Sequence, residues 1–256
     1  MILLLDIGNT HTHIGLAVES IVKRRNLPTD KWSSGEAGAL VKNFAGRRKI
    51  EGAILCSVVP QATLKAREAL GGIWNLEAME LNAKTARGVG IDYPRPKTIG
   101  ADRLANSVAA FKRFGAPVVV VDFGTAVTFD VVNSAGNYAG GIIAPGLAAM
   151  TDYLHEKTAL LPRIKIAEPK RVIGKSTEQA MLAGAVHGYR GLVRELIGEL
   201  KRELKADHLP VVATGGYAQL IAARLPEISA VEPNLTLEGL RLVWTATVGR
   251  ERGRLK

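Results

Sequence analysis

Two stretches of this chain place an aspartate and a glycine directly after a run of apolar residues. The first, Leu3 to Thr10, has the sequence LLLDIGNT, and the second, Val119 to Thr125, has the sequence VVVDFGT. Glycine permits a tight turn whose N–H groups can point at phosphate oxygens, and an aspartate at a strand end can hold a cation or its water. Either stretch alone is compatible with ordinary turn chemistry. Because the pattern occurs twice, we predict two hairpins that together grip a nucleotide.

The carboxylate of Asp102 is a third candidate for chemistry. Apolar side chains spaced by four and then three residues predict a helix over residues 101–113, which begins just after Gly100. Asp102 then lies in the first helical turn, where a carboxylate is ionised and held in one direction. Such a group can accept the proton of an attacking alcohol. A charge that merely stabilises the helix is the alternative.

The hydrophobic patterns predict two similar α/β halves that position these groups. In the first half we expect a hairpin over residues 1–18, a strand over 52–58, and helices near 36–44, 61–70 and 101–113. In the second half we expect strands over 117–122, 126–132 and 210–213, a loop over 140–146, and helices over 176–205 and 217–224. The break at residues 115–117 predicts two domains, 1–114 and 115–256.

The predicted helix over residues 176–205 carries a capping box at Ser176 and Gln179 and a long apolar stripe. Such a stripe needs a partner surface. A symmetric homodimer is the explanation that we favour, and packing inside its own domain is the alternative. Its members are Leu182, Val186, Tyr189, Val193, Leu196, Leu200 and Leu204.

Composition restricts the class of protein. The chain has 256 residues, a formal net charge of +10 from 34 basic and 24 acidic residues, and one cysteine, Cys56. This balance favours anionic ligands, but aromatic residues make up only 5% of the chain, so a base-stacking surface for nucleic acid is not expected. A single cysteine and the lack of a signal peptide or a long apolar run predict a cytoplasmic protein without disulfides or membrane spans.

Two other patterns are weaker. His11 and His13 alternate along a predicted strand and resemble a metal pair, but no third ligand has motif spacing, so contact with phosphate or strand packing is favoured. The segment Gly174 to Ser176 mimics the end of a P-loop, but Pro169 stands where that loop requires glycine. Gly215 and Gly216, between a strand and a helix, fit either a ligand close to the backbone or a plain helix entry.

Three segments, in this order and at this spacing, resemble the type III pantothenate kinases of the actin-like superfamily. They are Asp6 to Thr10, Tyr93 to Arg103 with the sequence YPRPKTIGADR, and Asp122 to Thr125. Residues 140–146, 157–162 and 174–180 continue the likeness over nearly the whole chain. The resemblance implies an α/β fold of two tandem actin-like (ribonuclease H-like) domains, with mixed β-sheets flanked by helices and an ATP cleft between them. His11 and His13 depart from the usual family pattern, which affects only the expected affinity for nucleotide.

The resemblance also implies a reaction, the phosphorylation of pantothenate by ATP to 4′-phosphopantothenate, the first step of coenzyme A biosynthesis. It implies that Asp102 is the general base and that Asp122 binds a monovalent cation, K⁺ or NH₄⁺. Asp6 is our candidate for Mg²⁺ bound through water, because Mg²⁺ on ATP keeps several waters. The implied ATP-binding residues are Asp6, Ile7, Gly8, Asn9, Thr10, His11, Thr12, His13 and Thr125. The implied pantothenate contacts are Tyr93, Gly100, Ala101, Asp102, Arg103 and Thr177.

Two other functions stay open at this point. One is a different phosphotransferase or a polyphosphate hydrolase of the same fold, because a fold does not fix a substrate. The other is a non-enzymatic transcription accessory protein, which the positive charge would suit. Tyr93 together with Gly100 to Arg103 argues against the first, and the intact Asp102 argues against the second.

Overall fold

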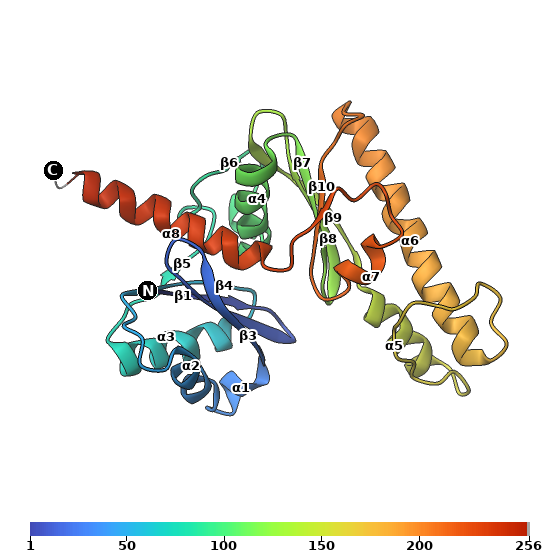
Figure 1. Cartoon of the computed structure of the whole chain (residues 1–256), viewed down its shortest axis with the longest axis horizontal. Helices are drawn as coiled ribbons and strands as arrows, with labels where there is room; N and C mark the ends of the chain where they lie inside the picture. Colours follow the sequence, from blue (N-terminus) through green and yellow to red (C-terminus); the bar gives the residue numbers. More distant parts are fainter. Residues whose placement is uncertain (255–256) are drawn as a thin grey trace. The chain divides into compact units, whose positions relative to one another are not determined.

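The computed structural model describes the backbone of residues 1–254 and the side chains of residues 1–248. These residues form two compact units, whose elements are labelled in Figure 1. The first unit contains residues 1–115 and 136–138 together with the chain from Asn234 onward, and the second contains residues 116–135 and 139–233. Both are built on a mixed β-sheet flanked by helices, as the sequence predicted.

The sheet of the first unit has the strand order β3-β2-β1-β4-β5. β1 and β2 form the predicted antiparallel hairpin, and β3 continues it. β1, β4 and β5 run parallel, so their carboxyl ends meet at one edge of the sheet, which is where ligands bind in open α/β sheets. The strands are β1 (Ile2–Ile7), β2 (His11–Ala17), β3 (Ile21–Pro28), β4 (Gly52–Ser57) and β5 (Met79–Glu80).

Helices cover both faces of this sheet because successive strand residues point to opposite sides. Leu3 and Leu5 belong to the core beneath α1, α2 and α3, whereas Leu4 belongs to the core beneath α4 and α8. Figure 1 shows these two helical layers on either side of the sheet. The helices are α1 (Asp30–Ser33), α2 (Ala37–Ala45), α3 (Pro60–Trp74), α4 (Ala101–Phe114) and α8 (Leu235–Arg254), with a short 3₁₀ turn η1 (Pro96–Thr98) before α4.

The helix α8 completes the first unit, although it follows the second unit in the sequence. Gly239 lies so close to α4 that an added Cβ would stand 2.0 Å from the carbonyl oxygen of Ala105. Leu240 and Val243 share one apolar cluster with Leu104. The expected second domain, 115–256, is therefore too long, because its last segment buries its apolar residues in the first unit.

The second unit repeats the plan of the first, with the strand order β11-β10-β7-β8-β9. β7 pairs antiparallel with β8 and parallel with β10, as β1 pairs with β2 and β4. β6 (Gly90–Ile91) pairs in parallel with residues 137 and 138 of β9, which belong to the first unit. The strands are β7 (Val118–Phe123), β8 (Ala126–Val132), β9 (Asn137–Pro145), β10 (Val211–Thr214) and β11 (Ala230–Val231).

The predicted loop over residues 140–146 is wrong, because these residues lie mostly in β9. Buried and more exposed residues alternate along this strand, which is the period of a β-strand. Its glycines concealed that pattern in the sequence, since they add little to either face. Gly140 has a positive φ of 116°, a backbone conformation that other residues rarely adopt.

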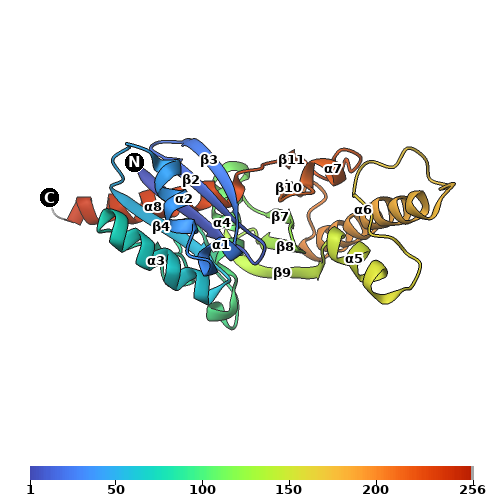
Figure 2. The ribbon, with the colours of Figure 1, turned by 90° about the horizontal axis from the view of Figure 1, so that it is seen from below.

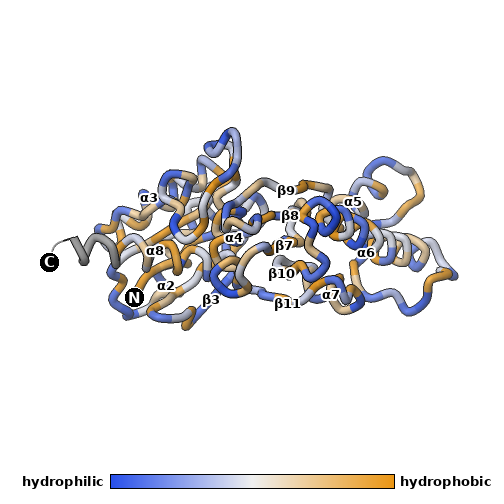
Figure 3. Tube along the Cα trace, turned by 90° about the horizontal axis from the view of Figure 1, so that it is seen from above, coloured by the Kyte–Doolittle hydropathy of each residue, from blue (hydrophilic) through white to orange (hydrophobic). Residues whose placement is uncertain are grey.

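The longest helix of the second unit, α6 (Thr177–Leu204), confirms the predicted long helix and its start. Ser176 caps it by accepting a hydrogen bond from the backbone N–H of Gln179 at 3.3 Å. Its apolar face, including Val186, Tyr189 and Val193, is buried in the core of the second unit. Figure 3 shows hydrophobic and hydrophilic residues alternating along α6. The stripe is thus covered by its own unit and gives no reason by itself to expect a dimer.

Two further helices complete the second unit, α5 (Leu147–Lys157) and α7 (Ala218–Ala222). Both are seen near α6 in Figure 2. None of the helices within residues 1–254 combines the length and the apolar character needed to cross a membrane.

Candidate active site

The first glycine hairpin joins β1 to β2 and presents a short polar turn. The N–H of Gly8 donates to the carbonyl oxygen of His11 at 3.0 Å, which closes the turn. Asn9, Thr10 and His11 are exposed at its tip. Ile7, by contrast, is fully buried in the core of the first unit. Of the residues predicted to bind ATP here, those at the tip are the ones whose side chains are open to a ligand.

A buried chain of hydrogen bonds supports this turn. The indole N–H of Trp32 donates to the hydroxyl of Thr12 at 3.0 Å, and that hydroxyl lies 3.1 Å from the hydroxyl of Thr29. Thr29 in turn donates to the carbonyl oxygen of Gly8 at 2.7 Å. Each hydroxyl has one proton, so Thr12 donates to Thr29. Thr12 therefore supports the turn, and no pattern in the sequence indicated its partners Thr29 and Trp32.

His13 faces the neighbouring strand. Its Nδ1 lies 2.9 Å from Oδ1 of Asn26 on β3, and these two residues are paired in the sheet. This contact agrees with the strand-packing interpretation of the histidine. No group of three or more metal-binding side chains of His, Cys, Asp or Glu is found among the described residues.

Two carboxylates of the first unit interact where β1 ends and α4 begins. Burial, and next the nearby charge of Asp102, raise the pKa of Asp6 to about 7. The thiol of Cys56, on the adjacent strand β4, donates to Oδ1 of Asp6 at 3.3 Å and acts in the opposite direction. Burial raises the pKa of the Cys56 thiol well above its usual value, so the sulfur keeps its proton. The sequence did not indicate Cys56 as a neighbour of the site.

The start of α4 fixes the direction of the Asp102 carboxylate. Oδ1 of Asp102 accepts a hydrogen bond from the backbone N–H of Arg103 at 2.9 Å. Burial raises the pKa of Asp102, while this N–H and the Arg103 guanidinium lower it. A Cβ at Gly100 would stand 2.5 Å from Oδ1 of Asp102. Glycine is thus required before the buried Ala101, because any larger residue would displace the carboxylate.

Tyr93 and Arg103 lie against the same aromatic ring. The ring of Tyr93 meets that of Tyr138 edge-on, with centroids 6.0 Å apart, and the guanidinium of Arg103 lies 5.7 Å from the Tyr138 centroid. Tyr138 itself is almost fully buried. The structure thus brings together Tyr93, Arg103 and Asp102 in the first unit, with Tyr138 as a platform that the sequence did not predict.

The second glycine hairpin joins β7 to β8 and packs against two glycine backbones. A Cβ at Gly215 would lie 2.5 Å from Oδ1 of Asp122, and a Cβ at Gly146 would lie 2.2 Å from the carbonyl oxygen of Thr125. Gly215 has a φ of +91°. The glycine at 215 therefore permits a close approach of β10 to Asp122. Gly216, which has open space around it, does not share this role.

Thr125 and Thr177 are the predicted ligand contacts of the second unit with exposed side chains. Thr125 lies at the tip of the second hairpin, and Thr177 is the first residue of α6. The N-terminus of a helix carries free N–H groups and a partial positive charge. Thr177 can therefore donate hydrogen bonds to an anionic ligand from a helix N-terminus, and the exposed hydroxyl of Thr125 can donate from the tip of the hairpin.

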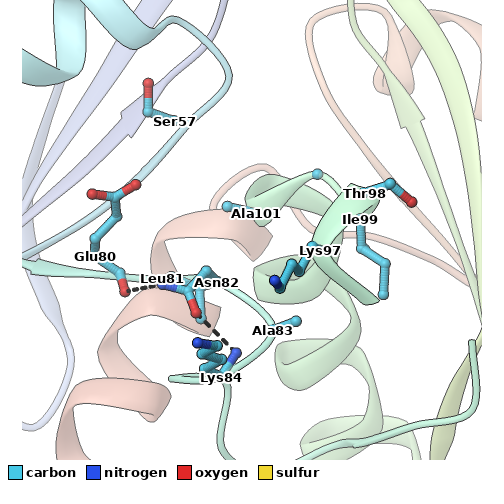
Figure 4. A pocket seen from close by; sticks show the side chains of 11 residues that line it. Ser57, Glu80, Leu81, Asn82, Ala83, Lys84, Lys97, Thr98, Ile99 and Ala101 are labelled. Carbon is cyan, nitrogen blue, oxygen red and sulfur yellow. Dashed lines mark hydrogen bonds between the residues drawn. The ribbon is translucent and has the colours of Figure 1, made fainter. Parts of the chain in front are cut away.

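A pocket of about 490 Å³ opens in the first unit (Figure 4). It lies at the carboxyl ends of β4 and β5 and reaches the start of α4. Lys84 and Lys97 extend into the labelled group of side chains from two different segments. The pocket is lined by Ser57, Glu80, Leu81, Asn82, Ala83, Lys84, Lys97, Thr98, Ile99, Gly100 and Ala101.

Comparison with known proteins decides the family. Residues 2–199 match the family model described as type III pantothenate kinase. The chain belongs to the type III pantothenate kinase family. The type III pantothenate kinase of Methylacidiphilum infernorum is 44% identical over 98% of this chain and 90% of its own length. That of Akkermansia muciniphila is 48% identical over 94% of this chain and 96% of its own length. The predicted family and the kinase class are thereby confirmed.

Solved structures support the fold at much lower sequence identity. A Campylobacter jejuni protein described as a Baf family transcriptional activator superposes with a TM-score of 0.62 at 19% identity, covering 96% of this chain and 99% of that one. An inorganic polyphosphate/ATP-glucomannokinase from Arthrobacter sp. strain KM gives a TM-score of 0.51 at 12% identity, covering 96% and 98%. Both structures confirm the predicted fold. At such low sequence identity they show the fold alone and say nothing about the activity of this chain.

Proposed function

We propose that this protein transfers the γ-phosphoryl group of ATP to the primary hydroxyl of pantothenate, giving 4′-phosphopantothenate and ADP. The observation that supports this most directly is the carboxylate pair of Asp6 and Asp102 in a chain of this family. One carboxylate is suited to a cation bound with ATP, and the other is suited to the proton of the attacking hydroxyl. The reaction is the first step of coenzyme A biosynthesis.

Asp102 acts as the general base. As the hydroxyl oxygen attacks phosphorus, the bond between phosphorus and the β–γ bridging oxygen breaks, and the hydroxyl proton passes to the carboxylate. Phosphoryl transfer asks a protein mainly for positioning and for neutralisation of charge. The hydrogen bond from the backbone N–H of Arg103 holds the Asp102 carboxylate in one direction, and Gly100 leaves room for it. This arrangement meets the need for positioning.

The two glycine hairpins bind ATP and its cations. Asn9, Thr10 and His11 at one tip and Thr125 at the other offer N–H, amide and hydroxyl groups for phosphate oxygens. Asp6 suits Mg²⁺, which accepts one carboxylate while keeping water and phosphate ligands. Asp122, beside the backbone of Gly215, suits a monovalent cation, K⁺ or NH₄⁺, because such ions accept carbonyl oxygens in place of water. These cations neutralise charge on the phosphates.

Pantothenate lies along the start of α4. Tyr93 and Thr177 supply hydroxyls for its amide and alcohol groups, and Gly100 and Ala101 allow it close to the backbone. Arg103, held over the ring of Tyr138, orients the alcohol end beside Asp102. These assignments rest on the family motif together with the positions of the side chains within each unit.

The protein acts as a homodimer, and the supporting surface differs from the one expected from the sequence. Large apolar side chains stay exposed along β9, α5 and the segment that follows. Such side chains would be covered if a second copy of the chain packed on this part of the second unit. These side chains are Ile143, Met150, Tyr153, Leu154, Leu160, Val172 and Ile173. Light scattering of the purified protein at micromolar concentration tests this, with twice the 27.4 kDa chain mass expected.

The release of ADP by the purified protein tests the proposed reaction. With Mg-ATP, turnover is expected only when pantothenate is present, and it is expected to be faster in potassium buffer than in sodium buffer. ATP hydrolysis that is indifferent to pantothenate would favour another phosphotransferase of this fold. No turnover at all, together with salt-sensitive DNA binding, would favour a transcription accessory protein.

A further inference from the structure

The pocket at the carboxyl ends of β4 and β5 carries positive charge on a rigid frame. Asn82 Oδ1 accepts hydrogen bonds from the backbone N–H groups of Lys84 at 2.8 Å and Thr85 at 3.3 Å. Thr85 also donates through its hydroxyl to the carbonyl oxygen of Glu80 at 2.7 Å. The segment that carries Lys84 is therefore fixed by its own hydrogen bonds, independent of any ligand.

Lys97 is presented from the opposite side of the pocket by an equally constrained segment. It lies in η1, where Pro96 fixes the backbone angle and the hydroxyl of Thr98 donates to the carbonyl oxygen of Arg95 at 2.8 Å. Figure 4 shows the Lys97 side chain directed toward Asn82 and Lys84. Two ammonium groups from different segments thus serve one pocket.

The two lysines outnumber the one acidic residue that lines the pocket. Glu80, the acidic residue among those that line it, lies 3.8 Å from the guanidinium of Arg67. Within the part of the chain that the structure describes, neither Lys84 nor Lys97 forms an ion pair. An anion that enters the pocket therefore meets two cations without displacing an existing partner.

Two residues of the pocket wall are next in the sequence to residues of the carboxylate pair or its contacts. Ser57 on its wall follows Cys56, which contacts Asp6, and Ala101 on its wall precedes Asp102. The start of α4 carries the carboxylate of Asp102, and the pocket wall carries the two lysines. Such a polarity suits a ligand that carries a hydroxyl at one end and an anionic group at the other. A volume of about 490 Å³ is in the range of small-molecule sites.

We propose that Lys84 and Lys97 bind the carboxylate of the substrate acid, while its hydroxyl lies beside Asp102. This inference rests on the proposed pantothenate kinase activity and specifies how the acid is distinguished from neutral analogues. It assigns the carboxylate to these lysines and not to Arg103, the cationic side chain among the implied pantothenate contacts. Arg103 does not line the pocket and lies instead over the ring of Tyr138.

The test measures KM for pantothenate and for its neutral analogue in which the carboxylate is reduced to an alcohol. Lys97→Gln is expected to raise KM for pantothenate about tenfold, the value of one charged hydrogen bond, with KM for ATP unchanged. Lys84→Gln should act in the same direction, and the double variant should lose more. KM for the neutral alcohol should be the same in every variant, because the alcohol has no carboxylate to pair with the lysines.

A matched control is Lys112→Gln, an exposed lysine in the last turn of α4, which should change neither KM. An unaltered KM for pantothenate in the double variant would overturn the inference, and so would an equal rise for the acid and the alcohol. Either result leaves the proposed reaction intact. Absence of pantothenate-dependent turnover in the wild type would instead reject the proposed function, and this inference with it.

Discussion

The two glycine hairpins share one frame but differ in what surrounds the aspartate. β1 lies between an antiparallel β2 and a parallel β4, and β7 lies between an antiparallel β8 and a parallel β10. Asp6 is paired with Cys56, whose side chain contacts it, and a second carboxylate raises its pKa. Asp122 is paired with Thr214, and the next residue, Gly215, brings bare backbone against it.

This difference shows that the repeated turn determines the frame, while the neighbouring strand determines the chemistry. A carboxylate that is close to a second carboxylate gains most from a divalent ion or a proton, because either one relieves the repulsion. A carboxylate beside carbonyl groups is suited to a weakly charged ion with several oxygen ligands. We therefore assign different cations to two hairpins that look alike in sequence.

The largest effect is expected from Asp102, the second carboxylate, which lies near the first hairpin and has no counterpart described at the second. Asp102→Asn should lower kcat by about 10² to 10⁴, the usual contribution of a general base, because the hydroxyl proton loses its acceptor. Binding of ATP should be retained. Steady-state kinetics and nucleotide titration of the same preparation measure both quantities, and an active Asn variant would contradict the assignment of the base.

The second hairpin is tested by its response to monovalent cations. Asp122→Ala should weaken or abolish activation by potassium, because the ion loses its charged ligand. Turnover measured over a potassium series, with the total ionic strength held constant by sodium, gives the midpoint. The comparison of the hairpins would fail if Asp122→Ala kept the wild-type midpoint.

The raised pKa of Asp6 predicts a pH-dependent stability of the protein without nucleotide or metal. The folded state holds a proton on Asp6 up to pH about 7, whereas the unfolded chain releases it near pH 4, so the free energy of unfolding falls between these values. Asp6→Asn removes this loss. At pH 8 the variant should be more stable than the wild type by about 2 kcal/mol. This is less than the free energy that corresponds to the whole pKa shift of Asp6, because the side chain keeps some contact with water.

Urea unfolding in EDTA at pH 5 and pH 8 measures this difference. The advantage of Asp6→Asn should shrink to less than half at pH 5, because the loss of stability begins at the pKa of the unfolded chain and is complete only above the folded pKa. A difference that is independent of pH would mean that burial and Asp102 do not disturb this carboxylate.

The smallest effect is expected from the support beneath the first hairpin. Thr29→Val removes the donor to the Gly8 carbonyl and leaves the hydroxyl of Thr12 without an acceptor, so KM for ATP should rise a few-fold and stability should fall by about 1–2 kcal/mol. Thr63→Val is the matched control, because it breaks the hydrogen bond from a threonine of α3 to the carbonyl oxygen of Val59 just before that helix. It should affect stability only, and an equal rise in KM for ATP would contradict the positioning role of Thr29.

The sequence predicted the parts of the fold that local patterns encode. The two hairpins, the start of α4 at Gly100 and the cap of α6 at Ser176 are each specified by neighbouring residues. The return of α8 to the first unit was not predictable in this way, because it depends on the contact between Gly239 and Ala105, which are 134 positions apart (239 − 105). The apolar stripe of α6 indicated that it packs against a partner but could not indicate which one.

The candidate site shows the same limit. The family motif led to Asp6, Asp102 and Asp122, because aspartate and glycine spacing is local. The motif did not indicate the buried chain of hydrogen bonds formed by Thr12, Thr29 and Trp32. It also did not indicate Cys56 or Tyr138, since these partners come from separate strands and loops. Residues that support a site are thus harder to find in a sequence than residues that contact the ligand.

The central claim is most directly tested by following the reaction of the wild-type protein with Mg-ATP and pantothenate in potassium buffer by ³¹P NMR. The account predicts that the γ-phosphate signal of ATP is replaced by a phosphomonoester signal on pantothenate, in equal amount with ADP, and that Asp102→Asn slows this conversion severely. Formation of inorganic phosphate in place of the ester, at the same rate with and without pantothenate, would contradict it.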